Sequence, residues 1–287
     1  MRTSMRGSMI VMLLFVFACG QPAASQTRPQ ATQRWIPTPG MTWQWQLTDA
    51  LDLTVPVHVY DLDLFETSAE TVQTIKQQDQ HVICYVNVGA WEEWRPDANA
   101  FPSSIIGKDY AGWAGEKWLD IRQINLLAPI MEQRFDQCRD KGFDGIEPDN
   151  LDNYENDTGF NINRADQLAY LNWLADAAHA RGLSIGLKNV PEFVPDVLSK
   201  YDWALTESCF KQGWCDQLTP FIEANKAVFA AEYTDEGSTT AQFCPLARQL
   251  RISAILKNRN LDAYRDACTS STYLPLIRSR TFNTALV

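Results

Sequence analysis

The segment 143–152 places several carboxyl groups at the end of a short apolar run. It reads Phe-Asp-Gly-Ile-Glu-Pro-Asp-Asn-Leu-Asp, and Pro148 ends the expected strand because proline cannot donate to a strand ladder. In an extended chain, Glu147 and Asp149 project to the same side. Carboxylates on one face of a strand end suit catalysis at the mouth of a β/α barrel. The other interpretation is an acidic turn in which Asp149 or Asp152 caps the next helix.

Polar residues also end or follow most of the other apolar runs that we expect to be strands. They are Asp61, Asp63, Tyr85, Asp120, Asn150, Lys188, Glu207 and Tyr233. Taken singly, a residue of this kind is most often a helix cap or a solvated loop residue. Because the C-terminal ends of parallel strands meet on one face of a barrel, the whole set would line a single cleft.

The residue types in this set favour acid–base chemistry by carboxyl groups. The three histidines of the chain lie away from the expected strand ends, which argues against a zinc hydrolase or a serine hydrolase. Two carboxyl groups on opposed strands, one protonated and one ionised, are the apparatus of glycoside hydrolysis. A divalent cation at Asp61, Asp63 and Asp120 is a weaker alternative because these residues are far apart in the chain. We expect no metal and no cofactor.

The elements that must position these residues alternate between short apolar runs and helical patterns. Nine strands are expected, at residues 42–47, 57–61, 82–88, 117–121, 143–147, 184–188, 203–207, 227–232 and 252–257. This alternation predicts a parallel sheet covered by helices. About ten residues separate the first two strands, too few for a helical crossover, so we assign 42–47 as an accessory strand. The other eight predict a single-domain (β/α)8 barrel. An open doubly wound sheet is the alternative, but no glycine-rich phosphate-binding motif follows a strand.

The first 34 residues read as a targeting segment and a linker. Residues 1–18 combine two arginines with a short apolar run, as a signal peptide does. The sequence ending at Cys19 resembles a bacterial lipobox, which predicts lipidation of Cys19 and a membrane anchor; ordinary cleavage near Ala18 or Ala24 is the alternative. Residues 19–34 predict a disordered tether, and 35–287 the barrel domain. The net charge of −10 argues against nucleic acid as a partner.

Export predicts an oxidising compartment, in which cysteines form disulfides. Without Cys19, six cysteines remain. Cys209 with Cys215 would close a tight loop, and Cys244 with Cys268 would bracket the last expected strand. Cys84 and Cys138 are then left either as a third pair or as free buried thiols.

Several motifs together resemble glycoside hydrolase family 114, the endo-α-1,4-polygalactosaminidases. They are Trp43-Gln-Trp-Gln-Leu47, Tyr60-Asp-Leu-Asp63, Trp118-Leu-Asp-Ile-Arg122, Asp144-Gly-Ile-Glu-Pro-Asp-Asn150, Gly186-Leu-Lys-Asn189 and Glu207-Ser-Cys-Phe210. The resemblance spans residues 35–268. It implies a β/α barrel, with Asp149 as nucleophile and Glu207 as general acid/base of a retaining mechanism. It also implies substrate contacts from Asp61, Asp63, Tyr85, Asp120, Glu147, Asn150, Lys188 and Tyr233.

The expected function is endo-hydrolysis of an α-1,4-linked galactosamine polymer by an exported monomer, with a membrane contact only through Cys19. An acidic cleft would attract such a polycation. A glycosidase of the same fold acting on another α-linked polysaccharide is one alternative. A non-catalytic polysaccharide-binding lipoprotein is another, and the presence of both Asp149 and Glu207 speaks against it.

Overall fold

The computed structural model describes residues 34–268. The expected signal peptide, most of the tether and Cys19 therefore lie outside the described residues. Arg34, which we assigned to the tether, forms a bidentate ion pair with Asp202 and so already belongs to the folded part. Within 34–268 no helix has the length and apolarity needed to cross a bilayer.

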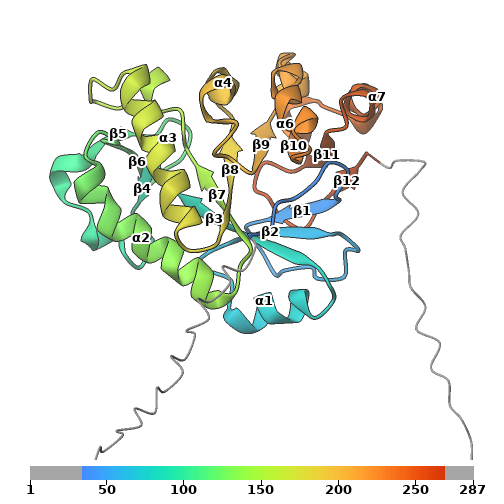
Figure 1. Cartoon of the computed structure of the whole chain (residues 1–287), viewed down its shortest axis with the longest axis horizontal. Coiled ribbons are helices and arrows are strands. Elements are labelled where there is room, and N and C mark those ends of the chain that lie inside the picture. Colours follow the sequence, from blue (N-terminus) through green and yellow to red (C-terminus); the bar gives the residue numbers. More distant parts are fainter. Residues whose placement is uncertain (1–33, 269–287) are drawn as a thin grey trace, which may run out of the picture. The chain divides into compact units, whose positions relative to one another are not determined.

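The main sheet has nine strands, of which the first eight run parallel in the order β1-β2-β3-β7-β8-β9-β10-β11. A short β12 pairs antiparallel with β11. The bounds are β1 Trp43–Gln46, β2 Val59–Asp63, β3 His81–Asn87, β7 Gly145–Asp149, β8 Ser184–Lys188, β9 Trp203–Glu207, β10 Val228–Tyr233, β11 Ser253–Lys257 and β12 Asp266–Ala267. Eight parallel strands in one domain confirm the predicted β/α barrel (Figure 1).

The assignment of the accessory strand was wrong. β1 pairs in parallel with β2, with Trp43 opposite Val59, and is a full member of the barrel sheet. Residues 47–58 connect the two strands without a helix. A crossover of about a dozen residues is long enough to return the chain to a parallel start, and it need not be helical.

The strand expected at 117–121 lies outside the barrel sheet. As β6 (Glu116–Leu119) it pairs antiparallel with β4 (Ala90–Glu92) and β5 (Ile106–Asp109) in a separate three-stranded sheet. This small sheet sits in the long connection between β3 and β7, so that connection carries a sheet as well as a helix. Asp120, which follows β6, is thereby removed from the row of barrel strand ends.

In the described part of the chain β1 and β11 do not pair as strands, and side chains bridge the seam between them. The indole Nε1 of Trp43 donates to the carbonyl of Ser253 (2.8 Å), and Arg265 Nε donates to the carbonyl of Trp43 (2.7 Å). Gln44 Nε2 donates to the carbonyl of Ala263 (3.0 Å). Together with β12, the chain after β11 fills the seam, and the first and last strands are held to each other through it.

Helices cover the outer face of the sheet. They are α1 Ala69–Lys76, α2 Ile124–Lys141, α3 Arg164–His179, α4 Val194–Val197, α5 Cys209–Gln212, α6 Thr219–Glu223 and α7 Thr240–Leu250. Helices α1, α2 and α3 pack beside one another against β3, β7 and β8. Asn163 begins α3 with a reciprocal capping box to Asp166, and Gly142 in the left-handed region ends α2.

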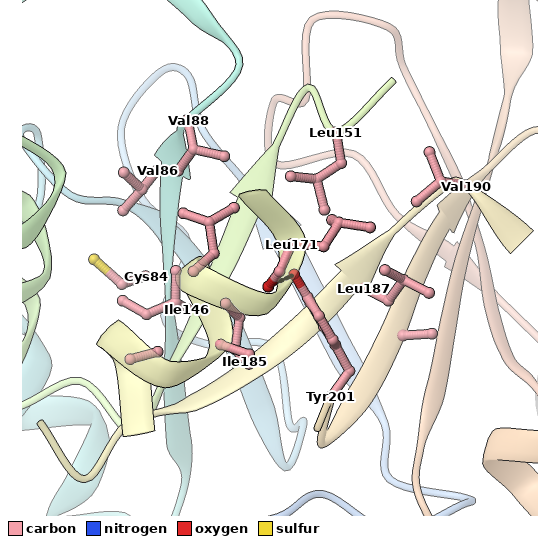
Figure 2. Close-up of a cluster of buried hydrophobic side chains, with 14 of the residues drawn as sticks. Cys84, Val86, Val88, Ile146, Leu151, Leu171, Ile185, Leu187, Val190 and Tyr201 are labelled. Carbon is pink, nitrogen blue, oxygen red and sulfur yellow. Dashed lines mark hydrogen bonds between the residues drawn. The ribbon is translucent and has the colours of Figure 1, made fainter. Parts of the chain in front are cut away.

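Two apolar cores support the strands. The outer core lies between sheet and helices; Figure 2 shows Ile146, Ile185 and Leu187 of the strands facing Leu171 of α3, where the hydroxyl of Tyr201 donates to the carbonyl of Leu171. The inner core fills the barrel with large aromatic side chains, among them Trp43, Trp203 and Phe229. This filling leaves the strand ends as the place where a ligand can enter.

All six cysteines of the described residues form disulfides. Cys84–Cys138 joins β3 to α2 within the outer core, and Cys209–Cys215 closes the loop after β9. Cys244–Cys268 ties α7 to the chain end beyond β12. Cys84 and Cys138 therefore form a third disulfide and are not free buried thiols. Three disulfides indicate folding in an oxidising compartment.

Candidate active site

Three barrel strands end on a charged residue that is followed at once by a residue in the left-handed backbone region. Asp149 on β7 precedes Asn150 (φ 62°), Lys188 on β8 precedes Asn189 (φ 53°), and Glu207 on β9 precedes Ser208 (φ 54°). A non-glycine residue in this region costs about 1–2 kcal/mol. The abrupt turn takes the backbone away from the barrel axis, so the preceding side chain stays at the mouth.

Side-chain hydrogen bonds hold these turns. The amide of Asn150 donates to Asn87 Oδ1 (3.1 Å), and the backbone amide of Glu207 donates to Asn189 Oδ1 (2.9 Å). Gly89 packs against the first turn so closely that a Cβ there would lie 1.6 Å from the carbonyl oxygen of Asn150. Glycine is therefore required at position 89 for the turn after Asp149 to form.

Lys188 stands between three carboxyl groups and is itself buried. Its Nζ donates to Glu147 Oε1 (2.8 Å) and Asp149 Oδ1 (2.8 Å), and lies 3.2 Å from Glu207 Oε2. The ammonium also lies 4.6 Å from the ring of Trp45, a cation–π contact. Burial by itself would lower the pKa of Lys188, but the charges of Asp149, Glu147 and Glu207 outweigh burial and raise that pKa well above its ordinary value. Lys188 is a permanent cation at the mouth.

Tyrosines complete the surroundings of the two exposed carboxylates. The hydroxyl of Tyr85 donates to Asp149 Oδ2 (2.8 Å), and that of Tyr233 donates to Glu207 Oε1. Burial and the nearby carboxylates raise the pKa of both tyrosines well above the ordinary value, so both stay protonated as donors. The side chain of Asp149 is 18% exposed and that of Glu207 27%, so both can be reached from the cavity.

A second layer of carboxyl groups lies under this pair. Asp61 and Glu147 are both fully buried, and both carboxyl oxygens of Asp61 and the Oε2 of Glu147 have no hydrogen-bond partner in the described part of the chain. Two buried carboxyl groups near each other cannot both carry a charge without a large cost. Burial, followed by the charge of Glu147, raises the pKa of Asp61 well above its ordinary value, and burial raises the pKa of Glu147 to about 7. Asp61 is thus held neutral below the ion pair of Glu147 with Lys188.

The mouth opens into a cavity of about 950 Å³. Its lining includes the aromatic residues Trp45, Tyr85, Trp94, Tyr110, Trp113, Trp214 and Tyr233. Its lining carboxylates are Asp63, Glu66, Glu92, Glu116, Asp149, Asp152, Glu155, Glu192, Glu207 and Glu236, against the cations Arg95, Lys188 and Arg259. Ten carboxylates and three cations leave an excess of seven acidic groups, and aromatic rings with acidic groups suit a cationic sugar chain.

The structure brings most of the predicted residues together. Asp63, Tyr85, Asp149, Asn150, Lys188, Glu207 and Tyr233 all line the cavity. Asp61 and Glu147 lie beneath its floor rather than in its lining. Asp120 is not part of the lining; it is buried in an ion pair with Arg122 (2.7 Å), which corrects its placement at the mouth.

Sequence reasoning missed the contribution of the small sheet. Glu92, Arg95 and Glu116 line the cavity from β4, the loop after it and β6, and Trp113 comes from the turn before β6. A signal was present in the unusually long stretch between β3 and β7, because a crossover of that length exceeds what one helix needs. In residues 34–268 no group of three metal-ligating side chains is placed to hold a metal ion.

The model of glycoside hydrolase family GH114 matches residues 24–273. The chain belongs to that family. This GH114 chain is a glycoside hydrolase, and the resemblance expected from its strand-end motifs is confirmed. A comparison with curated proteins finds no match.

Solved structures resemble this GH114 chain over nearly their whole length. Ega3 of Aspergillus fumigatus, in complex with galactosamine, is 38% identical, with 83% of this chain and 98% of that chain covered and a TM-score of 0.79. The glycoside hydrolase domain of PelA from Pseudomonas aeruginosa is 14% identical, with 80% and 98% covered and a TM-score of 0.67. The PelA likeness supports the fold alone.

Proposed function

We propose that this chain is an exported, endo-acting, retaining glycoside hydrolase that cleaves α-1,4-linked galactosamine polymers, with Asp149 as nucleophile and Glu207 as general acid/base. The bridge through Lys188 carries the proposal. Its Nζ lies 2.8 Å from an oxygen of Asp149 and 3.2 Å from one of Glu207, so these oxygens are at most 6.0 Å apart. Retaining glycosidases space their carboxyl groups by about 5–5.5 Å, and inverting enzymes by about 6.5–9.5 Å.

In the first step Asp149 attacks the anomeric carbon while Glu207 gives its proton to the departing glycosidic oxygen. The C–O bond to the leaving chain breaks, and an ester between Asp149 and the sugar forms. Lys188 and Tyr85 each donate to Asp149 and hold its carboxylate in position for attack. Tyr233 donates to Glu207 and fixes the direction of its carboxyl group.

In the second step a water molecule enters on the side that the leaving chain has vacated. Glu207, now ionised, takes a proton from this water as it attacks the anomeric carbon. The ester bond breaks, and Asp149 returns to a carboxylate beside Lys188. Two inversions at the same carbon give net retention of the α-configuration.

Two observations support a galactosamine polymer as substrate. The cavity has an excess of seven acidic residues, which would attract the ammonium groups of such a chain. The 38% identical Ega3 is a galactosamine-binding structure. Trp94 and Trp113, about half exposed at the cavity, offer faces on which sugar rings can stack. An open cavity with such platforms suits cleavage within a chain.

Export is supported by the three disulfides, which form and persist in oxidising compartments. The apolar run in residues 9–18 and the cysteine at position 19 support a signal peptide with lipidation at Cys19. Globomycin treatment of the producing bacterium tests the anchor: accumulation of the uncleaved precursor is expected, and Cys19→Ser should release the protein from the membrane. Normal processing of both forms would instead indicate ordinary cleavage.

The hydrolase proposal is tested by digesting partially deacetylated α-1,4-galactosaminogalactan with the purified protein. Oligosaccharides of mixed length, read by mass spectrometry, are the expected products. Proton NMR of the earliest products should show the α-anomer before mutarotation. Initial β-anomer would contradict the retaining mechanism, and absence of products would contradict the substrate.

Variants assign the two roles. Asp149→Asn and Glu207→Gln should each bind the polymer and release no products. Asp109→Asn is the matched control, because it makes the same change on a side chain that is 83% exposed and outside the cavity. Full activity in either of the first two variants would remove that residue from the catalytic pair.

A further inference from the structure

Two glutamates of the small sheet face each other beside the candidate catalytic pair. Glu92 on β4 and Glu116 on β6 are direct partners in the antiparallel ladder. Both are buried, at 2% and 9% exposure, and both line the cavity. Like charges directly opposite on paired strands destabilise a sheet. Two buried glutamates opposite each other at a cavity wall therefore indicate a functional site.

The hydrogen-bonding capacity of this acidic pair (Glu92 and Glu116) is not used up within the protein. Glu92 Oε1 pairs with Arg95 (2.8 Å), but Glu92 Oε2 is buried without a hydrogen-bond partner. The Glu116 carboxylate accepts a long hydrogen bond from Asn87 Nδ2 (3.4 Å). Buried polar atoms are normally satisfied, so an open acceptor here marks a place for a donor from outside the chain.

Charges around the acidic pair leave it negative. Two cations act on Glu92, and each is shared with another carboxylate: Arg95 with Asp63 (2.7 Å) and Arg134 with Asp97 (2.7 Å). Asp149 adds a further negative charge from β7, and neutral Tyr85 comes from β3. Burial, then the charges of Glu92 and Asp149, raise the pKa of Glu116 to about 7. A cation brought into the cavity would relieve this repulsion.

We propose that Glu92 and Glu116 form a subsite that binds the ammonium group of an amino sugar and so selects free amines over N-acetylated units. This inference rests on the proposed function, and it names the residues that make the choice. An ammonium group is a compact triple donor and matches open carboxylate acceptors. An N-acetyl group brings no charge, and it offers a carbonyl oxygen to carboxylates that are themselves acceptors. The subsite therefore both attracts the amine and disfavours the amide.

The proposal has a definite pH signature. As the pH falls through about 7, Glu116 takes up a proton and loses its charge, while the sugar ammonium remains charged. Binding of the free-amine ligand should therefore weaken towards pH 5.5. The N-acetylated ligand carries no ammonium group, so its binding should not change as Glu116 titrates.

The experiment measures binding by calorimetry with two probes, an α-1,4-galactosamine pentasaccharide and its fully N-acetylated form. Turnover is blocked by Asp149→Asn, and Glu116→Gln is added to that background. At pH 7.5, adding Glu116→Gln should weaken the binding of the amine pentasaccharide by about tenfold to a hundredfold. This is the usual effect of losing a charge-assisted hydrogen bond. The N-acetylated probe should bind equally to both proteins. The pH dependence that distinguishes the amine probe from the N-acetylated probe should be lost with Glu116→Gln, because the titration of Glu147 remains in both proteins.

Glu93→Gln is the control, because Glu93 is next in sequence, exposed and outside the cavity lining. It should change neither affinity by more than about twofold. Glu92→Gln provides a second test variant if Glu116→Gln does not fold, and the pH series on the background protein needs no further variant. Equal weakening of both probes, unchanged binding of the amine probe, or no binding of it by the background protein would overturn the inference. Polymer cleavage by the parent protein is scored separately, so the hydrolase proposal stands or falls on its own result.

Discussion

Lys188 is the residue on which the charge balance of the barrel mouth depends. It contacts the carboxyl groups of Glu147, Asp149 and Glu207 from a position that is 2% exposed. Taking one partner from a buried ion pair leaves an uncompensated charge, which is far more costly than replacing the whole pair. The same cation contacts both Asp149 and Glu207 and holds them close together, so the charge balance of the mouth and the proposed catalytic geometry depend on one side chain.

Lys188→Met should lower the free energy of unfolding by about 3–5 kcal/mol at pH 8. The loss should be smaller at pH 5. The pKa of Glu147 is already raised from 4.5 to about 7 in the folded protein and rises further without Lys188. The native state then binds more protons than the unfolded state, so stability falls as pH rises through that window. Urea titrations at both pH values measure this. Lys226→Met, which removes contacts only to backbone carbonyls, should cost about 1 kcal/mol at either pH.

A complementary prediction concerns Asp61, whose raised pKa keeps the buried side chain neutral. Asp61→Asn is also neutral and has nearly the same shape, so its unfolding free energy should stay within about 1 kcal/mol of that of the parent. Asp61→Ala removes the carboxyl group and opens a cavity, so a loss of about 3 kcal/mol is expected. Guanidinium titration separates the two variants. Equal destabilisation by both would show that Asp61 is ionised rather than protonated.

The sequence indicates the side of the strand on which these residues lie but not their depth. Alternation correctly placed Glu147 and Asp149 on the inward face of β7. It could not show that one lies below the floor of the cavity and the other at its edge, because depth depends on how neighbouring strands are staggered. Asp61 was expected to contact substrate for the same reason. Glu92 and Glu116 were missed because a local pattern does not reveal which strands pair.

At the scale of elements, the sharp turns after β7, β8 and β9 set the direction of Lys188 and of the two carboxyl groups proposed for catalysis. Gly89→Ala would bring a Cβ against the carbonyl of Asn150 and push the turn after Asp149 away. We expect kcat to fall by about tenfold or more, since displacing a catalytic group by about 1 Å has effects of this size, and stability to fall by about 2 kcal/mol. Steady-state kinetics and thermal melting measure both.

Gly112→Ala separates this steric effect from backbone strain. Gly112 has a φ of +94° and no neighbour within 4 Å of an added Cβ. It should lose about 1 kcal/mol through strain alone and keep its kcat. If Gly89→Ala behaved in the same way as Gly112→Ala, the close approach to Asn150 would have no catalytic consequence.

The positions of the strands in the sequence were largely predictable, but the pairing of the strands was not. All nine apolar runs became strands, because buried strands need continuous apolar residues whichever sheet they join. The choice between β1 and β6 as the barrel member failed for a physical reason. Whether a strand enters the barrel depends on which distant strand it pairs with, as Trp43 pairs with Val59. The local hydrophobicity of a segment does not identify that pairing strand.

At the scale of the whole molecule, Cys244–Cys268 secures the seam of the barrel. It joins α7 to the segment that reaches back to β1, across a separation of 24 residues. Replacing both cysteines by serine should cost about 3 kcal/mol on the chain-entropy model. Amide hydrogen exchange should then rise at β1 and β11 before it rises at β7. The matched double variant at Cys209 and Cys215, which opens only the loop after β9, should leave the exchange of β1 unchanged.

The position of the seam also has a consequence for biosynthesis. Trp43 leaves the ribosome early, whereas its acceptor Ser253 follows 210 residues later. The ring of strands therefore cannot shut during translation or translocation until almost the entire polypeptide has been delivered. Until that moment the tryptophans of the inner core remain accessible to chaperones and proteases. A chain released before residue 253 lacks its closing strand, so premature termination should yield material for degradation rather than a shortened enzyme.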